Sequence, residues 1–375
     1  MSNGSPTITV IGGGVIGCTI AYRLAERGAH VTLVEREAVG AGATGASGGH
    51  IMVWPGEAND VRVELSKESV QLFRRYLPDI KKRSGIDPLD QELKFFFPAF
   101  DEGEAVHLRN LAERVAKVGV AIEWLDAAAG LNLEPRLSPD ILGGILHPEC
   151  VQVGGYQFVE ALKKASTSIG VQFLQDEAVG LWENDNHVTG VALRDGIDIS
   201  CNTVVLAMGA WTGHLASEWL EAQLPITPYS LQRLRLKGLD EPLAATVNWG
   251  DINVTPRRDD LIHAGSIHNP AGFDAIPKEE IQKAILDKVS IAVPGLRYEV
   301  AEDLVATASM TPDRLPLVGA IDALAGVYLA VPGNDGFTMS AVMAEALTEL
   351  ITDERQHPLL GLMLPSREMS ESVTE

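Results

Sequence analysis

Cysteine is scarce in this chain, and its spacing argues against two common kinds of site. Only three of the 375 residues are cysteines, Cys18, Cys150 and Cys201, and no two of them form a C-x-x-C pair. That pattern argues against a structural zinc site and against a disulfide framework. It is typical of a protein in a reducing compartment, so we expect a cytoplasmic location.

Basic residues and long apolar runs are also lacking. Lysine and arginine number 30 against 51 acidic residues, a formal net charge of −21. Such a surface repels nucleic acid, although a local basic pocket could still hold an anionic substrate. No apolar run reaches the roughly eighteen residues of a membrane span, and the polar start MSNGSPT predicts no signal peptide. We expect a globular protein of two domains.

What the chain does have is a glycine turn near its start. The apolar run 8–11 predicts a buried parallel strand, and G-x-G-x-x-G follows at Gly12, Gly14 and Gly17. In this motif the first glycine permits a tight turn and the second lets the backbone approach a pyrophosphate. The third lets the helix pack closely on the strand. We expect a helix over 14–27 whose N-terminus faces phosphate.

An acidic residue follows at the distance typical of a nucleotide-binding unit. Glu35 comes directly after a second predicted strand, 30–34. A carboxylate there can accept both ribose hydroxyls and disfavours a 2′-phosphate, which argues against NADP. A purely structural glycine turn is the alternative. Strand, helix and acid in register favour binding of the ADP half of a dinucleotide.

Hydrophobic periodicity predicts further elements along the whole chain. We expect helices over 59–83, 104–118, 156–168, 278–289 and 337–351. We expect strands over 93–100, 171–174, 203–209, 224–236, 261–267 and 326–331, and a hairpin over 181–194. The segments 203–209 and 326–351 are a second and a third piece able to face a cofactor. A nucleotide site built from the first and last thirds of a chain favours FAD over NAD.

Several motifs together resemble one enzyme family. They are GGGVIGCTIAYRLAERGAHVTLVE, GATGASGG, VVLAMGAWTG, TPRRDDLIHAGS, SMTPDRLPLVG and VPGNDGFTMS. The chain resembles the FAD-dependent amine oxidases of the D-amino-acid oxidase superfamily, in particular the glycine oxidase and monomeric sarcosine oxidase group. The resemblance implies an α/β fold with an interrupted Rossmann-like FAD-binding domain and an α+β, antiparallel-sheet substrate domain, a p-hydroxybenzoate-hydroxylase-like layout. We assign 1–90, 145–215 and 300–366 to the FAD domain, 91–144 and 216–299 to the substrate domain, and 367–375 to a flexible tail.

The resemblance also implies which residues contact FAD. The pyrophosphate would lie on Gly12, Gly14 and Gly17, and the adenosine on Glu35, Arg36 and the backbone of Ala178. The flavin and its ribityl chain would lie along Thr44, Ser47, Gly48 and Gly49, and the nucleotide would be flanked by Ala207, Gly209 and Trp211. The flavin pyrimidine ring would face Gly333, Asn334, Asp335, Gly336, Phe337 and Thr338, where the last helix stabilises reduced flavin through its dipole. Thr44 and Ser47 could instead be turn formers, and Trp211 a core residue.

The flavin is expected to be bound without a covalent link. Sarcosine oxidases tether it to a cysteine whose position here is Ala306. Cys18 falls inside the first predicted helix, and Cys150 and Cys201 are assigned to connecting segments. We therefore expect non-covalent FAD.

The residues that bind the substrate carboxylate in the family are replaced here. The arginine of glycine oxidase falls at Ala308 or Ser309, and its tyrosine at Asn253. Two further positions of the last turn become Asn334 and Thr338. The remaining cations near the expected site are Arg233, Arg235, Arg257 and Arg258, with Arg257 taken as a substrate-binding candidate. Each of the four could equally be a solvated strand or turn charge.

Three histidines are the catalytic candidates. His50 follows the flavin loop, His263 lies where sarcosine oxidase has a lysine linked to oxygen reduction, and His268 falls at a position that faces the glycine oxidase pocket. A protonated imidazole near the flavin could stabilise superoxide or orient a carboxylate. A structural role is the alternative for each.

The resemblance implies oxidation of the C–N bond of a small secondary amine or amino acid. Hydride would pass to flavin N5, the imine would hydrolyse, and O2 would reoxidise the flavin to give H2O2. Because the residues that bind the carboxylate of a small amino acid in the family are replaced here, we expect an N-substituted glycine with a sizeable apolar part. The alternatives are a D-amino or imino acid dehydrogenase that reduces a quinone, and a nucleotide-binding regulatory protein. Assembly into a homo-oligomer is left open.

Overall fold

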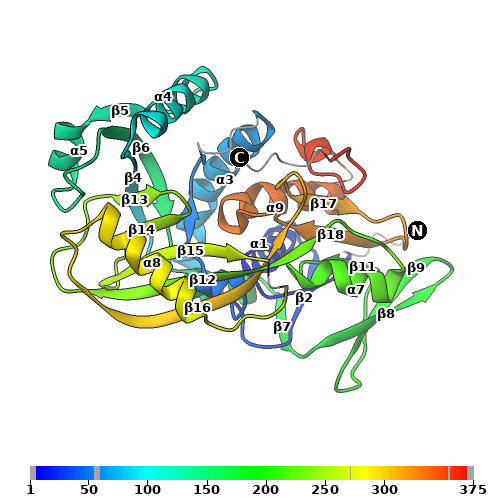
Figure 1. Ribbon diagram of the computed structural model, residues 1–375. Coiled ribbons are helices and arrows are strands. Elements are labelled where there is room, and N and C mark those ends of the chain that lie inside the picture. Colours follow the sequence, from blue (N-terminus) through cyan, green and yellow to red (C-terminus); the bar gives the residue numbers. More distant parts are fainter. Residues whose placement is uncertain (1–5, 55–59, 271, 354, 370–375) are drawn as a thin grey trace.

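A six-stranded, mostly parallel sheet forms one layer of the molecule. The computed structural model describes residues 6–54, 60–270, 272–353 and 355–369 (Figure 1). The strand order is β17–β18–β11–β1–β2–β7, parallel except for the β17–β18 edge. Its members are β1 Thr7–Ile11, β2 His30–Glu35, β7 Gln172–Gln175, β11 Thr203–Leu206, β17 Leu317–Ala320 and β18 Val327–Val331.

The register of this sheet brings distant segments to one edge. Val10 of β1 pairs with Leu33 of β2 and with Val205 of β11, and all three side chains are buried. Such continuous apolar strands are typical of a parallel sheet covered on both faces. The carboxyl ends of β1, β2 and β11 therefore open together, which is where ligands bind in sheets of this kind.

Helices and a small sheet cover the two faces. One face packs against α1 Val15–Glu26, α3 Asp60–Ser84, α6 Gly155–Thr167 and α9 Gly336–Thr352 in one buried cluster. The other face packs against α7 Trp211–Leu220 and the sheet of β8 Ala178–Asn184, β9 His187–Leu193 and β10 Ile199–Ser200. Among the helices of the described residues, none is both long and apolar enough to cross a membrane.

A second, nine-stranded sheet forms the other layer. Its order is β16–β12–β15–β14–β13–β4–β6–β3, with β5 also on β6, and its pairs are antiparallel except β13–β4. Its members are β3 His50–Ile51, β4 Gln91–Ala99, β5 Glu123–Asp126, β6 Gly143–Gln152, β12 Thr227–Gly238, β13 Thr246–Trp249, β14 Ile252–Pro256, β15 Leu261–Asn269 and β16 Tyr298–Met310. The remaining elements are α2 Ala43–Ala46, α4 Glu102–Lys117, α5 Ala127–Leu133, α8 Glu279–Ala292 and η1 Leu360–Leu362.

Strand alternation gives the antiparallel sheet one apolar face and one polar face. Leu234, Leu236 and Val254 pack with Ile285 and Val289 of α8 in a buried cluster. On β12 the alternate residues 231, 233 and 235 point to the opposite face. That second face looks toward the parallel layer and forms the roof of the site described below.

The predicted fold class is confirmed, and most predicted elements lie within a few residues of the observed ones. Three strands that line the roof were not predicted: β13, β14 and β16. β13 and β14 are only four and five residues long, and the thirteen residues of β16 do not alternate strictly between apolar and polar side chains, so none of the three gives a clear period of two. One assignment was wrong: Cys150 does not lie in a connecting segment. It lies inside β6 and is fully buried there.

The predicted domain boundaries can be compared with the two sheets. Every strand of the parallel sheet lies in a segment assigned to the FAD domain. β6 and β16 of the antiparallel sheet cross the predicted boundaries at 145 and 300, and Arg367 of the predicted tail forms an ion pair with Asp313 at 2.9 Å. Asn59, where a helix was expected to begin, and residues 370–375 lie outside the described residues. The division into two domains stays a prediction.

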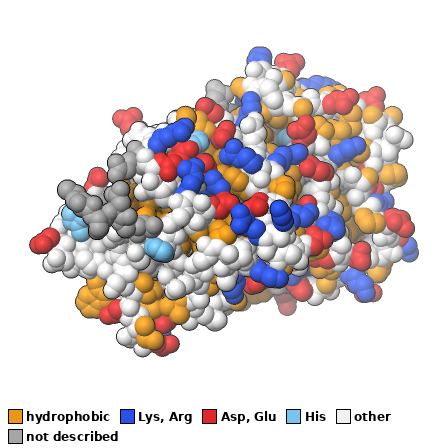
Figure 2. Space-filling view, turned by 180° about the vertical axis from the view of Figure 1, so that it is seen from behind, with side chains coloured by type: hydrophobic (Ala, Val, Ile, Leu, Met, Phe, Trp, Pro, Cys, Tyr) orange, Lys and Arg blue, Asp and Glu red, His pale blue; other side chains and the backbone are white. Residues whose placement is uncertain are grey.

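Acidic and basic side chains are mixed on one face of the molecule (Figure 2). Figure 2 shows, on the face opposite to that of Figure 1, lysine and arginine interspersed with aspartate and glutamate rather than gathered on separate areas.

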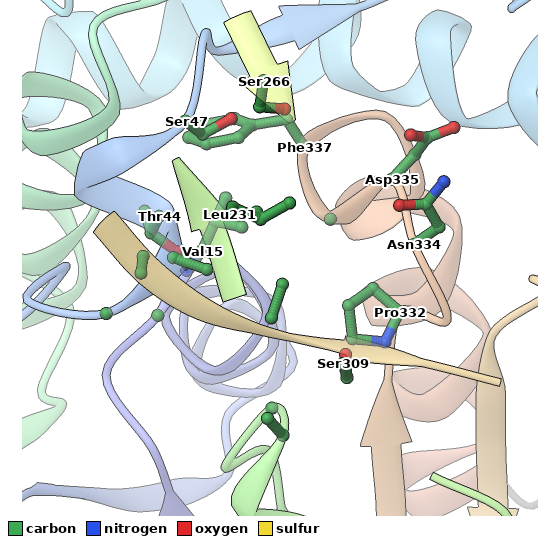
Figure 3. A pocket seen from close by; sticks show the side chains of 18 of the residues that line it. Val15, Thr44, Ser47, Leu231, Ser266, Ser309, Pro332, Asn334, Asp335 and Phe337 are labelled. Atoms are coloured by element: carbon green, nitrogen blue, oxygen red, sulfur yellow. Dashed lines mark hydrogen bonds between the residues drawn. The ribbon is translucent and has the colours of Figure 1, made fainter. Parts of the chain in front are cut away.

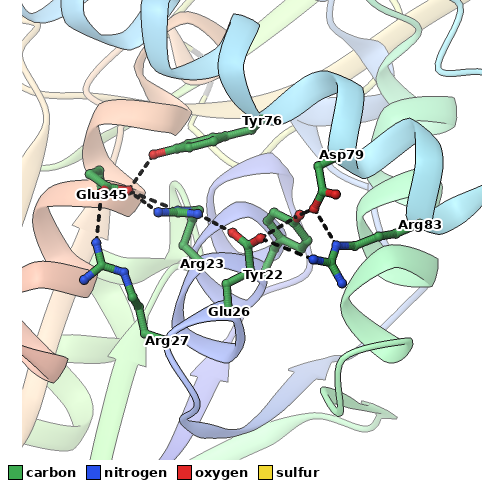
Figure 4. Close-up of polar contacts among 8 residues, drawn as sticks. All are labelled: Tyr22, Arg23, Glu26, Arg27, Tyr76, Asp79, Arg83 and Glu345. Atoms are coloured by element: carbon green, nitrogen blue, oxygen red, sulfur yellow. Dashed lines mark hydrogen bonds and ion pairs between the residues drawn. The ribbon is translucent and has the colours of Figure 1, made fainter.

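A buried carboxylate ties three helices together behind the parallel sheet (Figure 4). Glu345 of α9 is 5% exposed and accepts hydrogen bonds from Arg23 Nε at 3.0 Å, from Arg27 Nη2 at 3.2 Å and from the Tyr76 hydroxyl. Tyr22 of α1 in turn donates to Asp79 of α3 at 2.6 Å. Burial alone would raise the pKa of Glu345, but the bond from Tyr76 and the charge of Arg23 outweigh it and lower the pKa below 4.5.

Glu345→Gln should lower the free energy of unfolding by about 2–3 kcal/mol at pH 7, because it leaves two arginines without their shared counter-charge. Because the pKa of Glu345 is lower in the folded than in the unfolded chain, the ionised carboxylate stabilises the fold above pH 4.5. This stabilisation is lost as the pH falls through the folded-state pKa. The difference in the free energy of unfolding between wild type and Glu345→Gln, measured by denaturant unfolding, should therefore shrink below pH 4.5. Glu113→Gln, an exposed change on α4, is the control. An unchanged difference between pH 7 and pH 3 would contradict this account.

Candidate active site

A large cleft of about 1770 Å³ lies between the two sheets. Figure 3 shows Thr44 and Ser47 on one side of it and Asn334 and Asp335 of the β18–α9 turn on the other. Most of the predicted site residues line the cleft. They are Gly12, Gly14, Glu35, Arg36, Thr44, Ser47, Gly48, His50, Ala178, Ala207, Gly209, Trp211, Asn253, His268, Ala308, Asn334, Asp335, Gly336, Phe337 and Thr338.

Five predicted residues do not line the cleft: Gly17, Gly49, Gly333, Arg257 and His263. The first two are packing glycines. A Cβ on Gly17 would lie 1.9 Å from the carbonyl oxygen of Gly12, and one on Gly49 would lie 1.9 Å from that of Val153. They shape the cleft by allowing close backbone approach rather than by touching its contents.

The glycine turn makes one end of the cleft. α1 begins at Val15, whose N–H donates to Thr44 Oγ1 at 3.0 Å, and Gly14 has no side chain to cap the helix. Glu35 accepts from the Gly13 N–H through Oε2 at 2.6 Å and from the Glu37 N–H through Oε1 at 2.9 Å. This end therefore combines a helix N-terminus, small residues and a fixed carboxylate. That set fits the pyrophosphate and ribose of a dinucleotide.

An arginine and two aromatic rings stack on one another at the glycine-turn end of the cleft. The Arg36 guanidinium lies 4.5 Å from the ring centroid of Trp211, and Trp211 lies 5.5 Å from Phe273. Trp211 is only partly buried, so it belongs to the cleft wall rather than to the core. Phe273 was missed by the sequence reasoning because it comes from the distant β15–α8 connection.

The second helix start faces the cleft beside the first one, since a Cβ on Gly336 would lie 3.8 Å from Cγ1 of Val15. α9 begins at Gly336, and its N-cap Asp335 forms an ion pair with Arg62 of α3. Thr338 donates to the carbonyl oxygen of His50 at 3.3 Å and accepts from the N–H of Met52 at 3.4 Å. Through these two hydrogen bonds Thr338 holds β3, and with it His50, at the N-terminus of α9.

The roof of the cleft carries a chain of polar contacts. The hydroxyl of Thr255 donates to Asn253 Oδ1 at 3.2 Å, which leaves its oxygen to accept from His50 Nε2 at 3.1 Å. The register continues this row across the sheet, since Asn253 pairs with Gly265 of β15 and Gly265 pairs with Arg233 of β12. One polar wall therefore extends from β3 to β12.

The three catalytic candidates are neutral histidines. Burial, with the positive charges of Arg233 and Arg257, lowers the pKa of His50 to about 3. Burial also lowers the pKa of His268, and places that of His263 well below 6.5. The expected protonated imidazole is therefore not supported at neutral pH. His263 pairs with Thr255 in the sheet register but is buried and does not line the cleft, and it accepts from Arg235 Nε at 3.4 Å.

The four candidate arginines have different surroundings. Arg257 forms an ion pair with Asp259 at 2.6 Å, outside the cleft, so it does not occupy the predicted substrate position. Arg235 pairs with Glu302 at 2.7 Å, and Arg258 with Asp87 at 3.0 Å. Arg233 alone of the four lines the cleft.

A second, apolar wall adjoins the polar one at His50 and was missed entirely. The ring of His50 meets Phe95 edge-on at 4.9 Å, Phe95 lies 6.1 Å from Trp54, and Trp54 lies 5.8 Å from Phe97. Leu108 and Leu111 of α4 line the cleft beside them. We call Trp54, Phe97, Leu108 and Leu111 the aromatic wall. Its members come from α4, from β4 and from the segment after β3, and each alone resembles a core residue in the sequence.

None of the three cysteines lines the cleft. All three are buried, whereas Ala306 is among the lining residues. Burial raises the pKa of Cys18 and of Cys150, so neither presents a thiolate.

Comparison with known proteins places the chain in a family. Residues 7–350 match the model of the family described as FAD dependent oxidoreductase (DAO). The chain is 25% identical over 355 residues to glycine oxidase from Pseudomonas putida, covering 93% of this chain and 94% of that protein. It is similar in structure to glycine oxidase from Geobacillus kaustophilus, with a TM-score of 0.90, 22% identity and coverage of 98% and 100%.

A longer relative matches as well. The chain is 27% identical over 376 residues to the bifunctional protein ThiO/ThiG of Nostoc sp., covering 98% of this chain. It spans 56% of that protein, about half of its length. Since the family model covers most of the sequence and the glycine cradle fits a dinucleotide, the family predicted from the motifs is confirmed. The chain belongs to the FAD dependent oxidoreductase (DAO) family.

Proposed function

We propose that this FAD-dependent oxidoreductase oxidises the C–N bond of a small secondary amine or amino acid of the N-substituted glycine type. The observation that carries the proposal is the continuity of the cleft. One cavity joins the dinucleotide cradle to a chamber lined by the polar wall and, next to it at His50, by the aromatic wall. Bound FAD supplies the hydride acceptor and the means to pass electrons to O2 with release of H2O2.

The chain's own residues orient the substrate. Neutral His50 and Asn253 offer hydrogen-bonding groups on the roof, and neither competes for the proton of an amine at neutral pH. A deprotonated amine is the form that can lose hydride, so a wall of low basicity that is shielded from water suits this reaction. Positioning, rather than proton abstraction by a strong base, is the contribution assigned to the protein.

The shape of the chamber favours a substituted amine over glycine. Ala308 and Asn334 line the cleft at positions where larger or charged side chains bind small amino acids in the resembling enzymes. The aromatic wall provides apolar surface beside them. An N-substituent packed there would be stabilised by about 0.8 kcal/mol for each buried methylene.

Peroxide release over a substrate series tests the proposal. With O2 as acceptor, we expect kcat/KM to rise from glycine through sarcosine to longer N-alkylglycines, since each methylene adds apolar contact. Proline and D-amino acids complete the series, and a soluble quinone under anaerobic conditions is the parallel assay. Glycine turning over faster than every N-substituted analogue would contradict the proposed substrate. Quinone reduction without peroxide would identify a dehydrogenase.

Leu108→Trp tests the aromatic wall. The larger side chain should fill the space beside Trp54 and Phe97, lowering kcat/KM for N-butylglycine roughly tenfold while leaving sarcosine within about twofold. Leu108→Met, which conserves volume, is the matched control and should resemble wild type. Equal losses for both substrates would show that the wall does not hold the substituent.

Denaturation tests how the flavin is held. Because no cysteine lines the cleft and Ala306 occupies the tethering position, acid or heat denaturation should release all the flavin into the supernatant. Absorbance of the supernatant and of the precipitated protein measures the two fractions. Flavin that remains with the washed protein would contradict non-covalent binding.

A further inference from the structure

We propose that Arg233 binds the carboxylate of the substrate, an inference that rests on the proposed function. The site then has a fixed polarity, with the anion at the β12–β15 side of the roof and the N-substituent at the aromatic wall. Nothing in the glycine turn or the helix starts determines this polarity. It follows from the surroundings of one arginine.

Arg233 is a buried cation without a counter-charge. It is 9% exposed, its Nη2 donates to Ser266 Oγ at 3.0 Å, and its Nε has no hydrogen-bond partner. Within the described part of the chain, no carboxylate lies within ion-pair distance of it. Burial, together with the charge of Arg235, lowers its pKa only to about 10, so the guanidinium is still protonated at pH 7. A buried, unpaired charge is unfavourable unless a ligand supplies the opposite charge.

The backbone around Arg233 is shaped to admit it to the cleft. The β12–β15 register shifts between Gln232 and Arg233, which makes Ser266 the extra residue of a bulge in β15 beside the arginine. The partner residue is Gly265 at φ +121°, where a Cβ would lie 2.9 Å from the Cβ of Arg233. The glycine therefore removes the side chain that would crowd the arginine at this point of the sheet.

The groups beside Arg233 suit an anion. Ser266 and Asn253 are neutral and line the cleft, and His268 next to them is neutral as well. The two acidic residues of the cleft nearest α9 already have ion-pair partners, because Asp313 pairs with Arg367 and Asp335 pairs with Arg62. A planar guanidinium with open donors is the group that binds a carboxylate most specifically, through two parallel hydrogen bonds.

Contacts along the roof give the direction of the bound molecule. Asn253 shares a register row with Arg233, Thr255 joins Asn253 to His50, and His50 meets Phe95 beside Trp54. The order along the wall is thus cation, neutral amide and hydroxyl, imidazole, then aromatic rings. An N-substituted amino acid has the same order of groups: carboxylate, amine and apolar substituent. Within β12, Arg233 is four residues from Tyr229, a separation of about 13 Å along the strand. Tyr229 in turn pairs with Ala308 of β16.

A comparison of charged and neutral substrates tests the proposal. Arg233→Met should lower kcat/KM for N-ethylglycine roughly 100-fold, because the carboxylate loses its cation. It should change kcat/KM for N-ethylglycinamide, which has no carboxylate, by less than about threefold. Arg233→Lys keeps the charge without the planar fork and should lie between the two. Arg258→Met removes an arginine outside the cleft and is the control.

A binding measurement separates this proposal from the proposed function. Acetate titrated into the FAD-loaded enzyme, followed by the visible flavin spectrum and by calorimetry, should bind wild type and Arg258→Met equally. Its Kd should rise at least tenfold in Arg233→Met. This readout needs no turnover, so it tests Arg233 even if none of the amines is oxidised.

Three results would overturn the assignment. They are equal losses for N-ethylglycine and its amide, an acetate Kd unchanged in Arg233→Met, and loss of FAD from that variant. The last would assign the arginine to the cofactor or to the fold instead of to the substrate. FAD content per protein, measured for each variant before kinetics, identifies that outcome.

Discussion

The close backbone approach at the end of β1 is the constraint on which the rest of the site depends. A Cβ on Gly12 would lie 2.4 Å from the carbonyl oxygen of Ala207, and one on Gly17 would lie 1.9 Å from that of Gly12. Only glycine permits these distances, and they bring β1, α1 and β11 together at one point. The N-terminus of α1 consequently faces the cleft, and Glu35 at the end of the neighbouring strand reaches the same turn.

The second sheet completes the site because its register, rather than its residue types alone, places the polar groups. Asn253, Gly265 and Arg233 come from three strands and lie side by side only through antiparallel pairing. A shift of one residue in β12 would turn Arg233 into the apolar layer with α8 and bring Leu234 to the cleft. The core packing of Leu234 and Leu236 against α8 therefore also fixes the position of the cation.

Sequence reasoning found more of the cleft-lining residues at the glycine turn than at the aromatic wall, for a physical reason. Gly12, Gly14 and Glu35 belong to one local unit, whose spacing is set by a turn, a helix and a strand in direct succession. Trp54, Leu108 and Phe273 come from segments joined only in the folded chain, and each alone resembles a core or loop residue. Arg233, Arg235, Arg257 and Arg258 are indistinguishable by type. Only the observed ion pairs of three of them separate Arg233 from the rest.

The negative net charge and the buried arginine act over different distances. At physiological ionic strength the field of exposed charges is screened beyond about 8 Å, so the charge of −21 has little effect on an anion already inside the cleft. The buried cation of Arg233 is screened far less, because little water surrounds it. Selection for a carboxylate would then depend on short-range pairing at Arg233 and not on long-range attraction to the surface. An acidic protein can in this way carry a site for an anionic substrate without a basic surface patch.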